Sequence, residues 1–148
     1  MNWRNIIIHC SDSNFGDAAE IRRWHMEPPR NWADCGYHFV ILNGVRKSKQ
    51  PFNEIDNGKI ETGRPIDQAG AHCAGMNHNS IGICLIGKEE FEPAQFEAAA
   101  ILINDLMQQF PTIDTVLGHY QTETGAAQGK TCPNFDVDQY KLDYDIKG

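Results

Sequence analysis

Two apolar runs constrain the fold of this chain more than any other feature of its sequence. Residues 6–8 are three consecutive isoleucines, and residues 80–87 read Ser-Ile-Gly-Ile-Cys-Leu-Ile-Gly, without polar alternation. A strand that is apolar on both sides is typical of a sheet that is covered on both faces. Residues 35–42 and 115–117 are also predicted strands. The sequence therefore predicts an α/β fold, with a central mixed sheet of about five strands flanked by helices.

Two helices have clear end signals. Asp17 is followed three residues later by Glu20, which is the pattern of a capping box at a helix N-terminus. Pro93 suits the first position of a second helix, and Pro111 is expected to end it. Between these prolines an apolar stripe at spacings of three and four residues predicts the buried face, made of Phe96, Ala100, Ile103, Met107 and Phe110.

Three segments are predicted to lie outside this regular core. Residues 45–58 are polar and contain a proline, which indicates an excursion or widened hairpin with an exposed tip. Residues 120–129 contain Gly125, Gly129 and two alanines, which suggests a mobile groove wall that orders on substrate. Residues 136–148 are expected to dock as a final helical turn or two.

The length, net charge and hydrophobicity of the chain argue against several functional classes. A length of 148 residues suits one domain, which we expect to span residues 1–148. The net charge of −7 argues against a nucleic-acid partner, because binding phosphates needs a basic face. No stretch approaches the roughly 20 apolar residues of a bilayer span, and the N-terminus does not resemble a signal peptide. We therefore expect a protein that is made in the cytoplasm, does not insert into membranes and is a monomer.

Three potential metal ligands stand out. His9 ends the first apolar run, His119 follows the short strand at residues 115–117, and Cys132 lies two residues after Lys130. Two imidazoles and a thiolate, with a fourth position open, would form a catalytic zinc site. From spacing alone this hypothesis is level with the alternative that all three are core or surface residues. The other thiols are expected to be buried and structural: Cys10, Cys35, Cys73 and Cys84.

Several stretches, in order along nearly the whole chain, resemble zinc-dependent N-acetylmuramoyl-L-alanine amidases of the type-2 amidase and peptidoglycan-recognition-protein superfamily. They are Ile-Ile-His-Cys-Ser at 7–11, Glu-Ile-Arg-Arg-Trp-His at 20–25, Gly-Tyr-His-Phe at 36–39, Gly-Arg at 63–64, residues 78–87, Gly-His at 118–119, and Lys-Thr-Cys-Pro at 130–133. Together these motifs are very specific, although none would be so alone.

The resemblance implies a reaction and a set of roles. It implies that His9, His119 and Cys132 bind Zn²⁺ in a surface groove, and that Tyr37 and Lys130 are catalytic. The reaction would be hydrolysis of the amide between N-acetylmuramic acid and the L-alanine of a peptidoglycan stem peptide. The enzyme would act on the cell wall after release from the cytoplasm, as in phage or prophage lysis or in wall turnover.

The resemblance also suggests substrate contacts, for which alternatives remain open. His72 and Asn79 would border the substrate groove, although hydrogen bonds that stabilise their loop explain them equally well. Arg64 could bind a stem-peptide carboxylate, or it could form an exposed salt bridge. The alternative function is a peptidoglycan-binding module without turnover. Relatives that only bind usually lack the ligand cysteine, so the presence of Cys132 favours the enzyme.

Overall fold

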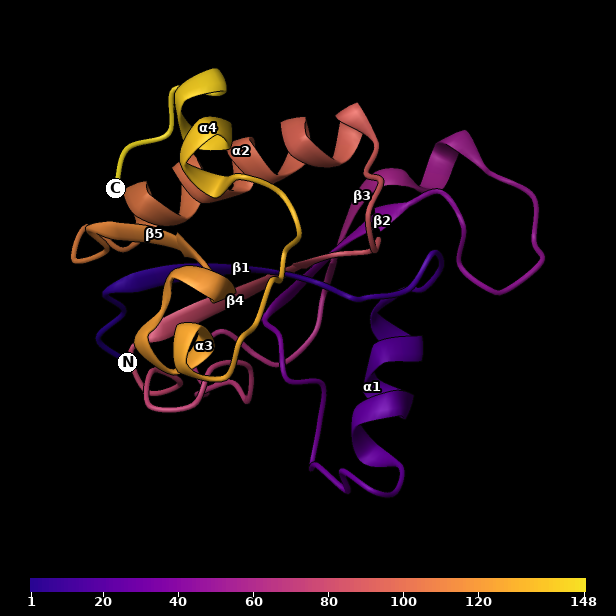
Figure 1. The fold of residues 1–148 in the computed structure, drawn as a ribbon, viewed down its shortest axis with the longest axis horizontal. Helices are drawn as coiled ribbons and strands as arrows, with labels where there is room; N and C mark the ends of the chain where they lie inside the picture. Colours follow the sequence, from indigo (N-terminus) through magenta and orange to yellow (C-terminus); the bar gives the residue numbers. More distant parts are fainter.

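A computed structural model describes all 148 residues and has a five-stranded mixed sheet at its centre (Figure 1). The strands are β1 (Asn5–Cys10), β2 (Phe39–Asn43), β3 (Asn57–Thr62), β4 (Ser80–Leu85) and β5 (Thr115–Gly118), in the spatial order β3-β2-β4-β1-β5. β1 pairs in parallel with β4 and β5, β2 pairs in parallel with β4, and β3 is antiparallel to β2. The predicted mixed sheet is confirmed.

Helices cover both faces of the sheet. The helices are α1 (Ala18–Met26), α2 (Pro93–Gln109), α3 (Glu123–Ala127) and α4 (Val137–Asp143), with short 3-10 turns η1 (Glu54–Asp56) and η2 (His119–Gln121). Figure 1 shows α2 and α4 on one side of the sheet and α1 and α3 on the other. None of these helices combines the length and the apolar character that crossing a bilayer requires.

Side chains of the central strands point alternately to the two faces of the sheet. One face packs against the larger core, and the other has room for a functional site. Ile6 and Ile8 of β1 belong to the larger core, which α2 and α4 complete. The side chains between and after them point to the opposite face, where His9 is paired in register with Cys84 and Ile7 with Gly82. A smaller core under α1 occupies only part of that face, so the end of β1 that carries His9 is left for a site.

The helix signals were correct apart from one detail of capping. The side chain of Asp17 accepts a hydrogen bond from the backbone N–H of Glu20 at 2.8 Å, as predicted. The Glu20 carboxylate does not complete the box, because it pairs with Arg23 at 2.7 Å instead. In α2, Ala100 and Ile103 of the predicted stripe are buried, and its remaining members pack partly buried against the same core.

One predicted strand boundary and one predicted loop were wrong. The second strand begins at Phe39 and not at residue 35, because the preceding carbonyls bind the segment around residues 64–71: Ala71 N donates to Gly36 O and Arg64 N to Tyr37 O. Residues 120–129 are helical over much of their length, in η2 and α3, rather than a loop. The hydroxyl of Thr122 caps α3 by accepting a hydrogen bond from Gly125 N at 3.0 Å. The sequence does not reveal this helix start, because the alanines and glycines that follow suggest mobility instead.

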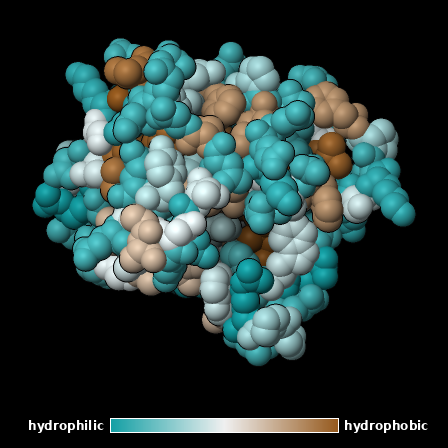
Figure 2. Space-filling view, in the orientation of Figure 1, coloured by the Kyte–Doolittle hydropathy of each residue, from teal (hydrophilic) through white to brown (hydrophobic).

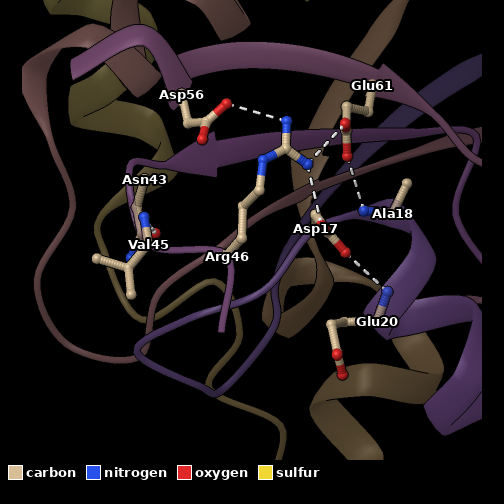
Figure 3. A network of polar contacts seen from close by, with 8 residues as sticks. All are labelled: Asp17, Ala18, Glu20, Asn43, Val45, Arg46, Asp56 and Glu61. Carbon is tan, nitrogen blue, oxygen red and sulfur yellow. Dashed lines mark hydrogen bonds and ion pairs between the residues drawn. The ribbon is translucent and has the colours of Figure 1, made fainter. Parts of the chain in front are cut away.

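The polar excursion after β2 is a widened hairpin, as predicted, and it is held by one arginine (Figure 3). The guanidinium of Arg46 binds the carboxylates of Asp17 and Glu61, each at 3.0 Å, and of Asp56 at 2.9 Å. Glu61 Oε1 also accepts from Ala18 N at 2.9 Å. One cation therefore ties the hairpin loop, β3 and the start of α1 together.

Removing this cation should destabilise the fold. Arg46→Ala leaves three carboxylates close together without their cation, so we expect the free energy of unfolding to fall by about 2 kcal/mol. Arg4→Ala is the control, because Arg4 and its partner Asp114 are 51% and 59% exposed, and such pairs contribute about 0–1 kcal/mol. Urea denaturation of both variants measures the difference, and equal losses would contradict the role given to Arg46.

Candidate metal and substrate site

The sheet topology brings two histidines from distant parts of the chain to one edge. His9 is the second-last residue of β1, and His119 follows directly after β5. Because β1 and β5 are parallel neighbours, with Ile8 opposite Gly118, their carboxyl ends coincide. The two imidazole ring centroids are 4.6 Å apart. The parallel pairing thus explains why residues 110 positions apart (119 − 9) can share one site.

Cys132 reaches the same edge on the segment that follows α3. Tyr120 N donates to Cys132 O at 3.0 Å, and Cys10 N donates to Cys132 Sγ at 2.9 Å. Lys130 N binds Gly125 O at 2.9 Å, which anchors the segment to α3. These backbone contacts hold the thiol beside β1 without using its ability to bind a metal.

The three side chains fit a metal ion. One ligand atom from each of His9, His119 and Cys132 can be chosen so that all lie within 4.8 Å of one another. Tetrahedral zinc with nitrogen and sulfur ligands places such atoms roughly 3.3–3.6 Å apart, so small rotamer changes would close the site. A soft thiolate with two imidazoles is a donor set that suits zinc.

The protonation of these groups also suits a metal. Burial lowers the pKa of His9 well below its usual value, with smaller contributions from His72 and His119. Burial and then the nearby charge of Lys130 lower the pKa of His119. Both rings are therefore neutral at pH 7 and can offer a lone pair. The hydrogen bond with the Cys10 thiol and then burial raise the pKa of Cys132, so the metal-free thiol keeps its proton.

A cavity of about 720 Å³ opens beside the three ligands. In the orientation of Figure 1, Figure 2 shows that this face is hollowed between the parts of the molecule that contain α3 and α1. His9, His119 and Cys132 lie on its wall with both predicted catalytic residues, Tyr37 and Lys130. A ligand bound there would reach all five side chains.

Tyr37 and Lys130 contribute different chemistry. The Tyr37 ring lies 5.0 Å from the His9 ring, centroid to centroid. Burial raises the pKa of Tyr37 well above its usual value, so its hydroxyl stays protonated and can donate a hydrogen bond. Lys130 is an exposed residue of the cavity wall and brings a positive charge. Together they provide two donors for a negative charge that develops in the cavity.

Of the predicted substrate-binding residues, His72 lies on the cavity wall and Arg64 does not. His72 lines the cavity but is buried, and both its ring nitrogens have protein partners. Arg64 is not in the cavity wall, because its guanidinium donates to the carbonyls of Cys35 and Ala69 at 2.9 and 2.8 Å. It forms neither a carboxylate site nor the alternative salt bridge. The geometry gives no support to a substrate role for Arg64.

Asn79 lies at the wrong end of the sheet for the predicted contact. Its backbone carbonyl accepts from Arg4 N and Asn5 N, next to the start of β1. Two residues earlier, Asn77 does line the cavity, and its Oδ1 accepts from the backbone N–H groups of His72 and Cys73. The structure therefore places Asn77, and not Asn79, on the cavity wall, a difference that spacing in the sequence could not show.

Part of the cavity lining was not predicted. Arg30 and Trp32 line the cavity, with the Arg30 guanidinium carbon 5.8 Å from the centre of the indole ring. His25 packs on the same indole with ring centroids 4.6 Å apart, while its Nδ1 accepts from Gly36 N. The only sequence signal was an arginine and a tryptophan within three residues after the Pro28-Pro29 pair.

The fold and this site define a class of α/β proteins. In this class a His-His-Cys cluster that suits a metal lies at the carboxyl ends of parallel strands, beside a cavity large enough for a substrate. A comparison with protein families is consistent with this class. The family described as N-acetylmuramoyl-L-alanine amidase matches residues 1–135, and the chain belongs to that family.

Individual relatives agree with this assignment. The endolysins of Klebsiella phage KP32 and Escherichia phage T7 are each 32% identical to the chain, over 146 and 147 residues, covering 91% of it and 83% of each relative. Among solved structures, N-acetylmuramoyl-L-alanine amidase LysC from Clostridium intestinale URNW superposes with a TM-score of 0.78 at 26% identity. That match covers 99% of this chain and 88% of LysC.

Proposed function

We propose that this protein is a zinc-dependent N-acetylmuramoyl-L-alanine amidase, which cleaves the amide between N-acetylmuramic acid and L-alanine in peptidoglycan. The observation that carries the proposal is the convergence of His9, His119 and Cys132 on one wall of a cavity that also contains Tyr37 and Lys130. Membership of the family supports the bond that is cleaved. Zinc, when bound by the three ligands, supplies a Lewis acid and activates water.

The remaining chemistry is assigned to the side chains of the cavity. Tyr37 donates a hydrogen bond to the carbonyl oxygen of the scissile amide as negative charge develops on it, and Lys130 stabilises the same charge electrostatically. A proton from the attacking water passes through Tyr37, or through a water that Tyr37 holds, to the leaving amine of L-alanine, so that Tyr37 is protonated again at the end of the step. Both donors lie on the cavity wall beside the ligands, where the scissile bond would have to bind.

The substrate is anionic, and the cavity rim offers matching charge. Stem peptides carry carboxylates, whereas the neutral histidines add no charge to the site. Arg30 and Lys130 are the cationic residues of the wall, and Asp12 is its acidic one. In a chain with a net charge of −7, this local excess of positive charge favours an anionic peptide.

We also propose that the protein acts as a monomer on the cell wall after release from the cytoplasm, with no nucleic-acid partner and without inserting into membranes. The name endolysin carried by the phage relatives supports action on the wall. Size-exclusion chromatography with light scattering tests the oligomeric state.

Mass spectrometry of digested, defined muropeptides tests the function, because it reports bond and substrate together. The amidase should release free stem peptide with a new L-alanine N-terminus, and chelation should stop this release. Binding to peptidoglycan without any new L-alanine N-terminus would support the recognition module instead and would overturn the enzyme assignment.

Zinc uptake should release about one proton per ion near neutral pH. The raised pKa of Cys132 means that zinc must displace its thiol proton, whereas His9 and His119, with lowered pKa values, are already neutral. The apparent affinity should therefore rise roughly tenfold per pH unit between about pH 6.5 and 8. Calorimetry in buffers of different ionisation enthalpy counts the protons, and zero protons would exclude Cys132 as a thiolate ligand formed on binding.

A further inference from the structure

His72 is a buried histidine that the proposed mechanism does not use. Its ring lies against two glycines that leave room for it: a Cβ on Gly82 would be 2.7 Å from the ring Cγ, and one on Gly70 would be 2.7 Å from Cδ2. The backbone N–H of His72 is fixed by Asn77 Oδ1 at 2.8 Å. The ring is thus seated in a slot on β4, on the same face of the sheet as His9.

The hydrogen bonds of the ring determine where its proton lies. His72 Nε2 is 3.1 Å from the backbone carbonyl oxygen of Ser80. A carbonyl oxygen can only accept, so Nε2 must carry the proton. In the neutral ring Nδ1 is then an acceptor, and its partner is His9 Nε2 at 2.9 Å.

The same reasoning extends to His9. Because His72 Nδ1 accepts, His9 Nε2 must donate and must carry the proton of its neutral ring. Only Nδ1 of His9 then keeps a free lone pair. Two hydrogen bonds therefore connect the backbone carbonyl of Ser80, on the neighbouring strand, through His72 to His9. They fix both the tautomer and the ring plane of this proposed metal ligand.

We propose that His72 is a positioning residue that holds His9 in the Nε2–H tautomer, so that Nδ1 is the atom offered to the metal. This inference rests on the metal site of the proposed function and assigns to His72 a role other than substrate binding. Outer partners of this kind typically contribute 10–100-fold to metal affinity.

The tautomer can be tested in the metal-free parent protein without any substitution. With uniform ¹⁵N labelling, the His9 ring should show a protonated Nε2, an unprotonated Nδ1, and a scalar coupling across the hydrogen bond from His9 Nε2 to His72 Nδ1. A His9 ring that is protonated at Nδ1, or that lacks this coupling, would overturn the proposal.

Variants test the consequence for zinc. His72→Phe fills the slot without an acceptor and should raise the dissociation constant for zinc about 10–100-fold in a chelator competition. His72→Asn can place an amide oxygen near the position of Nδ1 and should recover much of the affinity. His78→Phe is the control, because His78 is an exposed residue of the same loop and does not line the cavity.

The outcomes separate this inference from the proposed function. Unchanged zinc affinity in a folded His72→Phe variant would overturn the positioning role, even if the parent hydrolyses peptidoglycan. If His72→Phe does not fold, the spectrum of the parent and the affinity of His72→Asn still decide the question. The expected tautomer and zinc affinities in a parent that releases no L-alanine N-terminus would support the inference and reject the amidase.

Discussion

Replacing Cys132 with serine is expected to remove zinc binding and wall hydrolysis while leaving the fold largely intact. The substitution exchanges a soft thiolate ligand for a neutral hydroxyl, so the dissociation constant for zinc should rise by more than about 100-fold, beyond the range for an outer partner. The fold should persist because Cys132 is only partly buried and belongs to neither core cluster. Its backbone contact with Tyr120 also remains.

Three measurements check this result: zinc content after dialysis, release of L-alanine N-termini, and the unfolding midpoint of the metal-free protein. Cys35→Ala is the matched control, because Cys35 is a buried thiol of the smaller core and does not line the cavity. It should lose some stability but keep its zinc. A Cys132→Ser protein that hydrolyses wall as fast as the parent would refute the ligand assignment.

The second large effect is expected at Tyr37 and Lys130, which should matter for turnover and not for the metal. Loss of one preorganised donor to a developing oxyanion typically lowers kcat about 10²–10³-fold. We expect losses of this order for Tyr37→Phe and Lys130→Ala, with KM and zinc content changed little. The reason is that each donor engages charge that exists only in the transition state.

Steady-state kinetics on a defined muropeptide, with zinc measured in each variant, separates these effects. Lys88→Ala is the control for Lys130, because Lys88 is also an exposed lysine and lies outside the cavity wall. A variant whose KM rises while kcat is unchanged would show that its residue binds substrate equally in the ground and transition states. A loss of zinc would instead indicate a structural role.

The sequence predicted the sheet and the grouping of the three proposed metal ligands, for physical reasons that the structure makes clear. Short uninterrupted apolar runs are typical of central strands, and parallel strands bring their carboxyl ends to one edge. His9 and His119, each placed at the end of a predicted strand, therefore had to be close if the strands were neighbours. Spacing alone did not show that β1 and β5 are adjacent, and the family resemblance supplied that link.

The sequence left the roles of Arg64 and His72 open, because contacts formed in the fold decide which of their hydrogen-bonding groups stay free. Arg64 has the chemistry of a carboxylate receptor, but its guanidinium donates to the backbone carbonyls of Cys35, which is distant in sequence, and of Ala69, which is near. His72 has the chemistry of a substrate contact, but two glycines and the carbonyl of Ser80 seat it as a partner of His9. No local signal reports that a side chain's hydrogen-bonding groups are already engaged, and this information exists only in three dimensions.

The chain order of the ligands has a consequence for biosynthesis. His9 emerges first during translation, whereas His119 and Cys132 follow only after β4 and α2 have been made. The cluster cannot form until β5 has docked beside β1 and the segment after α3 has closed over the edge. A nascent or C-terminally shortened chain that ends before residue 132 therefore holds at most two of the three ligands in place. The protein becomes competent to bind its metal only when the sheet is complete, so metal uptake during synthesis would mark the completion of the sheet.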